Sequence, residues 1–193
     1  GERAGFVPDA RWKQDTKQEA WYTGDTLNMV IGQGFLTVTP LQMAVVTAAV
    51  ANGGYLLRPR LLSRILWPDW LGYGTQNFEQ PEGRKLEVDS RILAKVRQGM
   101  REAVESANGT AGIMRGLGVS VAGKTGSAQW QPGEKTHAWF VCFAPAETPR
   151  YAACVFVSEG GHGSTAAAPV ARKILAAAFG VTDRGGGSAG PGD

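Results

Sequence analysis

Three strand-like segments in the second half of the chain constrain its fold more than any other feature. Residues 119–128, 137–144 and 151–158 are rich in β-branched, aromatic and small apolar residues. A short segment with two prolines, residues 145–150, separates the last two. This pattern is typical of antiparallel strands joined by a hairpin. We therefore predict an antiparallel sheet of three strands.

Helices are predicted on either side of these strands in the sequence. The sequence Thr-Pro-Leu-Gln at 39–42 places an N-cap, a proline at the first helical position and Gln at the third, ahead of an apolar run to Ala51. A second helix begins near Asp89 and ends at Asn-Gly at 108–109. A third begins near Pro169 and ends before a glycine. We interpret the apolar stripe of the second helix as core packing: Ile92, Val96, Met100 and Val104.

The remaining segments are predicted to lack regular structure. The first forty residues show little periodicity, and residues 67–87 combine glycines and prolines in a pattern typical of a long surface loop. We expect the tryptophans of that loop to anchor one end of it. Residues 1–180 are predicted to form one folded unit, with residues 181–193 as a flexible glycine-rich tail.

Composition excludes several classes of function. The chain has 43% hydrophobic and 19% charged residues, as globular proteins do, and a net charge of +3 without a basic run, so nucleic acid is not an expected partner. Two histidines and two cysteines are too few for a metal centre or a disulfide scaffold, and Cys142 and Cys154 are expected to stay reduced. The start, which lacks Met and a leader pattern, indicates an internal piece of a longer protein.

One lysine belongs to two competing motifs. Residues 118–125 match the phosphate-binding pattern G-x-x-x-x-G-K-[ST], which needs a helix opening at the lysine. Lys124-Thr125-Gly126 also matches the third signature of the serine acyl-transferases that include penicillin-binding proteins and class A β-lactamases. A strand precedes the lysine, and the glycines and proline that follow it oppose a helix. The strand motif is therefore favoured over the phosphate loop.

The strand interpretation assigns a role to each residue of the motif. Lys124 would supply positive charge, Thr125 a hydroxyl for a substrate carboxylate, and Gly126 the space for a substrate lying along the strand edge. The backbone N–H of Ser127 would serve as an oxyanion donor. Trp130 either lines the cleft or packs on the loop that leaves the strand, and the sequence leaves both possibilities open.

The surrounding sequence resembles the C-terminal part of a class B penicillin-binding protein. The Ile-Gly-Gln-Gly form at 31–34 is more similar to the elongation-specific branch, penicillin-binding protein 2, than to the division-specific one. The matching segments follow one another in the family order over roughly residues 1 to 179: residues 1–8, 28–34, 37–44, 122–129, 137–140, 143–145 and 168–171.

This resemblance implies peptidoglycan cross-linking by serine acyl transfer, with β-lactams acylating the same serine. It implies that Lys124 belongs to the hydrogen-bonded cluster around the nucleophile, that Thr125 and Ser127 bind the carboxylate of the stem peptide or penicillin, and that the Ser127 N–H completes the oxyanion hole. It implies no cofactor and no metal. The implied partners are peptidoglycan stem peptides and a membrane glycan polymerase, and the implied location is the bacterial inner membrane, with the domain in the periplasm.

The chain departs from the family pattern in two elements. None of its eight serines has a lysine three residues later, so the Ser-x-x-Lys nucleophile is missing from the given sequence. Ser-Ala-Asn at 106–108 imitates the Ser-x-Asn element, but it follows an amphipathic helix and is interpreted as a helix cap. The chain alone is therefore expected to be inactive, and a non-catalytic scaffold module remains an alternative.

The resemblance also implies an α+β fold. The family core is a five-stranded antiparallel sheet flanked by helices, of which this chain would contribute the last three strands. The two absent strands and part of the helical layer would leave an exposed strand edge and an incomplete core. We therefore expect the isolated chain to be marginally stable and to aggregate.

Overall fold

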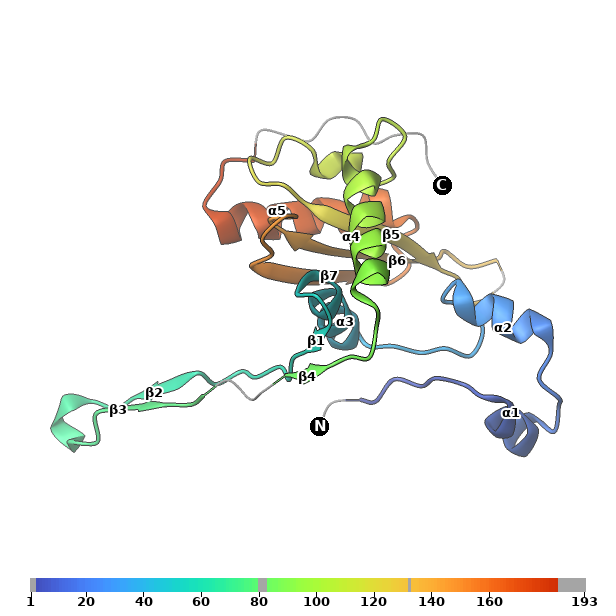
Figure 1. Ribbon diagram of the computed structural model, residues 1–193, viewed down its shortest axis with the longest axis horizontal. Helices are drawn as coiled ribbons and strands as arrows, with labels where there is room; N and C mark the ends of the chain where they lie inside the picture. The colour runs from blue at the N-terminus through green and yellow to red at the C-terminus, as the bar shows by residue number, and fades with distance from the viewer. Residues whose placement is uncertain (1–2, 80–82, 132, 184–193) are drawn as a thin grey trace.

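A three-stranded antiparallel sheet forms the centre of the molecule (Figure 1). Its strands are β5 (Ala122–Ala128), β6 (His137–Ala144) and β7 (Tyr151–Val157), in the order β5-β6-β7. This confirms the predicted antiparallel sheet and α+β class. The computed structural model describes residues 3–79, 83–131 and 133–183.

Helices cover both faces of this sheet. Alternate residues of a strand point to opposite faces, and those of β6 divide the core into two clusters. Phe143 packs on the face covered by α3 (Pro40–Ala51) and α4 (Ser90–Glu105), with Ala51 and Met100. The opposite face carries the larger cluster, which includes α5 (Ala168–Phe179): Phe140, Cys142, Val155, Ala171 and Leu175, with Met114 and Leu117.

The ends of α3 and α4 follow from their capping residues. The Thr39 side chain accepts from the backbone N–H of Gln42, whose side chain accepts from the Thr39 N–H, so the predicted capping box is confirmed. Asp89 caps the start of α4, and Ser106 is its C-cap. Ser106 therefore ends a helix, as predicted from the sequence.

The apolar stripe of α4 is only partly core, which corrects the prediction. Met100 and Val104 are buried, but the side chains of Ile92 and Val96 are 56% and 42% exposed. Leu93, outside the predicted stripe, is buried instead. Steps of four residues drift around a helix of about 3.6 residues per turn, so the predicted stripe leaves the covered face at its start, whereas Leu93, Met100 and Val104 lie on one face.

The N-terminal region contains two helices, α1 (Ala10–Lys17) and α2 (Thr23–Val30), where the sequence analysis predicted none. Asp9 caps α1 by accepting from the backbone N–H of Trp12. The Lys13 ammonium lies 2.8 Å from an Asp25 carboxylate oxygen and links the two helices. The prediction was wrong because these short helices are held by caps and an ion pair and bury almost no apolar stripe.

Strand β5 begins at Ala122 and not at residue 119. Gly118 has φ +84°, and residues 119–121 do not pair with β6 as part of the strand. The backbone N–H of Ala146 donates to both the carbonyl and the hydroxyl oxygen of Ser120. Ser120 thus ties the start of the strand to the β6–β7 connection instead of pairing along β6.

Part of the predicted long loop is a hairpin that extends away from the sheet and its helices (Figure 1). Trp67 packs edge-on against Tyr73, 5.5 Å between ring centroids. Trp70 is 81% exposed, so it does not anchor the loop, contrary to the prediction. The short elements of this arm are β1 (Tyr55–Leu56), which pairs with β4 (Arg84–Lys85), β2 (Arg64–Leu66), which pairs with β3 (Thr75–Asn77), and the 3₁₀ turn η1 (Asp69–Leu71).

The closing segment returns over the sheet and ends near the start of β5. It comprises the π turn η3 (Gly163–Ala167) and α5, which ends at Gly180 as predicted, with φ +64°. Buried Arg172 of α5 donates to Asp183 and to the carbonyls of Ile113, within η2 (Gly112–Met114), and of Arg115, just after it. The proposed tail beyond residue 183 lies outside the described residues, so the domain boundary at 180 stays a prediction.

Candidate functional site

Strand β5 places the Lys124 side chain at the surface of the sheet. Ala122 and Lys124 share the face covered by α3 and α4, because they are two residues apart. Ala122 is completely buried, whereas Lys124 is exposed. The Lys124 ammonium donates to the carbonyl oxygen of Thr125, 2.6 Å away. The lysine thus sits where the helical cover of this face ends.

The Thr125 side chain points to the opposite face. It is 3% exposed, and its hydroxyl lies 2.8 Å from the hydroxyl of Thr110, in the loop that follows α4. In this structure the hydroxyl therefore serves as a tie between β5 and that loop. At 3% exposure, Thr125 offers a substrate carboxylate little access in this structure.

Gly126 and Ser127 lie at the open end of the strand. A Cβ on Gly126 would come within 3.4 Å of the Trp139 Cβ, so the missing side chain leaves space over that face. On the other side, η3 approaches so closely that a Cβ on Gly163 would lie 2.7 Å from the Gly126 carbonyl oxygen. The Ser127 hydroxyl is buried and has no hydrogen-bond partner among the described residues.

The outer edge of β5 is free of other strands in the described part of the chain. The Ser127 carbonyl accepts from the side-chain amide of Gln33, 3.4 Å away, and Gln33 is not on β6. The N–H and C=O of one residue in an antiparallel strand point to the same side. The Ser127 N–H therefore also points to the open edge, the orientation that an oxyanion donor requires.

An aromatic row continues from this end of the strand. The exposed Trp130 ring stacks on His137, with 5.6 Å between centroids and 7° between planes. His137 meets Phe156 edge-on, and Phe156 packs against Trp139 at 4.6 Å. Trp139 is half-buried. Trp130 thus packs on a neighbour and is also 46% exposed.

The phosphate-loop alternative is contradicted by the local structure. That motif requires the lysine to open a helix, so that backbone N–H groups converge on a phosphate. Lys124 and Thr125 instead lie within β5, paired with Val141 and Phe140 of β6. Their backbone groups belong to a strand and form no anion cradle.

The other titratable groups of the described residues form no metal site and no reactive thiol. No set of three or more His, Cys, Asp or Glu side chains in residues 3–79, 83–131 and 133–183 could hold a metal ion. Both cysteines are free thiols. Burial raises the pKa of Cys142 to about 12 and that of Cys154 to about 11, which makes both poor nucleophiles. No helix in the described part is long and apolar enough to cross a membrane.

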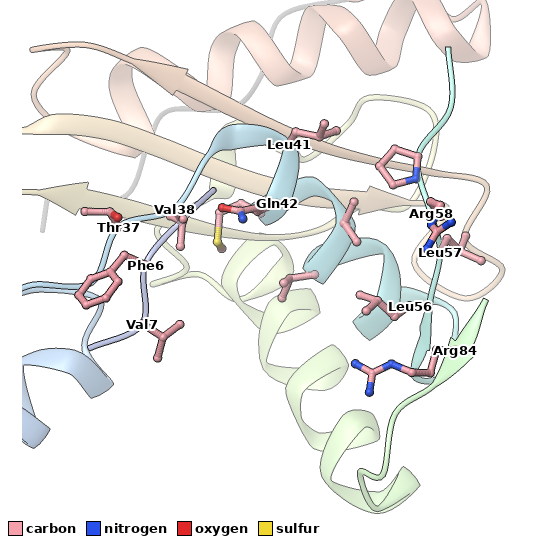
Figure 2. A pocket seen from close by; sticks show the side chains of 15 residues that line it. Phe6, Val7, Thr37, Val38, Leu41, Gln42, Leu56, Leu57, Arg58 and Arg84 are labelled. Carbon is pink, nitrogen blue, oxygen red and sulfur yellow. The ribbon is translucent and has the colours of Figure 1, made fainter. Parts of the chain in front are cut away.

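A separate apolar groove of about 900 Å³ lies between the N-terminal segment, α3 and the base of the hairpin arm. Figure 2 shows Phe6, Val38 and Leu41 on one side of it and Leu57 and Arg84 on the other. No residue of the Lys-Thr-Gly motif lines it. The groove is therefore distinct from the candidate site.

Sequence reasoning missed two residues of the candidate site, Thr110 and Gln33. In the sequence, Gly-Gln-Gly at 32–34 stands out only as part of the family resemblance. Gln33 is 94 positions from Ser127, and no local pattern signals such a contact. Gly32 and Gly34 both have positive φ, 77° and 75°. The turn that they form directs the Gln33 side chain toward β5.

The chain resembles known proteins throughout its length. Residues 1–176 match the family described as the penicillin binding protein transpeptidase domain. The peptidoglycan D,D-transpeptidase MrdA of Haemophilus influenzae is 33% identical over 191 residues, covering 90% of this chain and 29% of the relative. PbpA of Mycolicibacterium smegmatis, also a peptidoglycan D,D-transpeptidase, is 35% identical over 157 residues, covering 77% of this chain and 31% of the relative.

Solved structures agree with these relatives. Penicillin-binding protein 2 (PBP2) of Pseudomonas aeruginosa, in complex with WCK 5153, superposes with a TM-score of 0.78 at 34% identity, over 98% of this chain and 41% of that chain. PBP2 of Helicobacter pylori in complex with MreC gives a TM-score of 0.74 at 32% identity, over 93% of this chain and 32% of that chain. The chain thus spans less than a third of the length of the curated relatives named here.

Proposed function

The chain belongs to the penicillin-binding protein transpeptidase family, in its PBP2-type branch, and on that premise we propose that the protein of which it is part is a peptidoglycan D,D-transpeptidase. One observation supports this most strongly. β5 presents an exposed Lys124 beside a strand edge that no other described strand pairs with, and the Ser127 N–H points outward on that edge. A lysine next to an outward N–H is the arrangement that serine acyl transfer needs around its nucleophile.

The proposed reaction has two acyl transfers. A serine outside this chain attacks the carbonyl carbon between the two D-alanines of a stem peptide, the amide C–N bond breaks, and D-alanine leaves with a proton on its amine. An amine of a neighbouring stem then attacks the ester carbonyl of the acyl-enzyme, the C–O bond to the serine breaks as the new amide forms, and a proton from the amine returns to the serine oxygen. β-Lactams would acylate the same serine by opening their ring amide.

The residues of this chain would bind and orient the substrate. Lys124 would hold positive charge beside the nucleophile, and the Ser127 N–H would stabilise the oxyanion at the attacked carbonyl. Gly126 would let the peptide lie against the strand, and the exposed Trp130 would border the cleft. In the empty site, the Thr125 hydroxyl would order the strand through its hydrogen bond with Thr110. It would contact the substrate carboxylate only when the substrate is bound.

The cellular setting of the parent protein is part of the same proposal. Its place would be the bacterial inner membrane, with the transpeptidase domain in the periplasm, where the peptidoglycan substrate lies. It would work beside the membrane glycan polymerase that makes the strands to be linked, and so contribute to cell shape. The family assignment supports this setting, since the H. influenzae relative is a peptidoglycan D,D-transpeptidase.

Covalent labelling by a fluorescent penicillin tests the function. The full-length parent should form a labelled band that survives a denaturing gel, and Lys124→Ala should reduce the labelling rate by at least about a hundredfold, because the nucleophile loses its positive neighbour. Lys95→Ala, an exposed lysine on α4, is the matched control and should label normally. A well-folded parent that takes no label would contradict the proposal and favour the scaffold alternative.

A further inference from the structure

We propose that the side-chain amide of Gln33 is a displaceable stand-in for a ligand N–H at the Ser127 carbonyl. This inference rests on the proposed function, since it concerns how that site binds a peptide. Gln33 would occupy the carbonyl in the empty site and leave when a ligand offers its own donor there. It would thereby set the affinity for ligands that carry such a donor.

The structure shows two carbonyls of β5 occupied by side chains. The Thr125 carbonyl accepts from Lys124, and the Ser127 carbonyl accepts from Gln33. Residues two apart in a strand direct their carbonyls to the same side, so both belong to the open edge. Two outward carbonyls at this spacing form the pattern that an added peptide strand would pair with.

The loop that carries Gln33 is built to hold this amide in place. The Gln33 backbone N–H donates to the Asn28 carbonyl, 2.8 Å away, and fixes the turn to the end of α2. The positive φ of Gly32 and Gly34 confines the turn to a shape that other residues rarely adopt. The amide therefore approaches Ser127 from a fixed base, while its side-chain torsions leave it free to move aside.

The contact is weak enough to be displaced. At 3.4 Å between the Gln33 nitrogen and the Ser127 oxygen it is long for a hydrogen bond, and the Gln33 side chain is only half-buried. A ligand N–H at a shorter distance would bind this carbonyl better. The released amide would then be solvated or would bind another group of the ligand, so its departure would leave no buried polar group unpaired.

The experiment compares two β-lactams on the full-length parent and its variants. Benzylpenicillin carries an acylamido N–H that could pair with the Ser127 carbonyl, whereas a carbapenem with a hydroxyethyl group has no such N–H. Second-order acylation rates are measured for wild type, Gln33→Ala and Gln33→Met, which keeps the length and loses the donor. Gln98→Ala, which removes a glutamine amide on the surface of α4, is the matched control.

We expect both Gln33 variants to be acylated about two- to tenfold faster by benzylpenicillin, the range for the loss of one competing hydrogen bond. The carbapenem rate should stay within about twofold of wild type in the same proteins. Equal changes for both ligands would reveal a general structural role and overturn the inference, as would unchanged or slower acylation by benzylpenicillin. If neither ligand acylates the wild type, the proposed function itself fails, an outcome distinct from these.

Discussion

At the scale of single residues, the two hydroxyls of the motif strand are in contrasting environments. Thr125 has a partner in Thr110, while the Ser127 hydroxyl is buried without one within the described residues. A buried, unpaired hydroxyl is unfavourable, so Ser127 is the hydroxyl of the strand most ready to accept a new partner. Thr125 is the one that holds the strand in place.

The Thr110–Thr125 contact leads to a prediction about stability. Thr125→Val keeps the side-chain shape but leaves the Thr110 hydroxyl unpaired, and should lower the free energy of unfolding by about 1–2 kcal/mol. The double variant Thr110→Val/Thr125→Val should cost less than the sum of the two single variants, because both partners are removed together. Urea unfolding of the parent's transpeptidase domain measures all three. Strictly additive costs would show that the two hydroxyls do not stabilise each other.

At the scale of elements, the sequence predicted those helices in which a boundary signal adjoins an apolar run. The capping box at Thr39 and the cap at Asp89 placed α3 and α4 correctly. α1 and α2 were missed because what holds them is an ion pair between residues twelve positions apart, Lys13 and Asp25. Likewise, the motif on β5 was visible in the sequence, but the contact that Gln33 makes with it depends on tertiary folding.

The ion pair between α1 and α2 predicts a pH dependence. Hydrogen bonds from Lys13 and from the Tyr22 backbone N–H lower the pKa of Asp25 below its ordinary value of 3.8. A carboxyl with a depressed pKa stabilises the fold above its ordinary pKa, and this contribution disappears as the pH falls through the depressed value. The partner lysine has a raised pKa and stays charged throughout that acid range.

Thermal unfolding of wild type and Asp25→Asn between about pH 2 and pH 7 tests this dependence. Asp25→Asn should have the lower melting temperature near neutrality, and the two proteins should converge at the acid end of this range, as the pH falls through the depressed pKa of Asp25. Asp15→Asn removes a carboxylate of α1 that is 67% exposed and lies 3.7 Å from Arg11, and should have little effect at any pH. A difference between wild type and Asp25→Asn that persists in acid would assign the stabilisation to packing.

At the scale of the whole molecule, the chain has a well-packed half and an open half. The face of the sheet under α5 is closed by completely buried side chains such as Phe140. Elsewhere, large apolar side chains are exposed, among them Val46 and Leu41 of α3, and the groove of Figure 2 is open beside them. In the much longer relatives, other parts of the protein are available to cover such surfaces.

This asymmetry predicts that the 193-residue chain is poorly stable by itself. Its urea unfolding should be broad, with a low midpoint, and sedimentation should show association that increases with concentration, since exposed apolar surface drives self-association. The full-length parent, measured under the same conditions, is the control and should remain dispersed. A sharp transition of a stable monomer would contradict this expectation and would show that the described core is sufficient.

The open edge of β5 also raises the question of which molecules must be kept from pairing with it. Backbone donors and acceptors carry no sequence information, so an edge open to a stem peptide is equally open to the same edge of a second copy. Lys124 places a charge on this strand, and two such strands brought together would set like charges close to each other. Discrimination between substrate and self would then depend on the same side chain that is proposed to assist the acyl transfer.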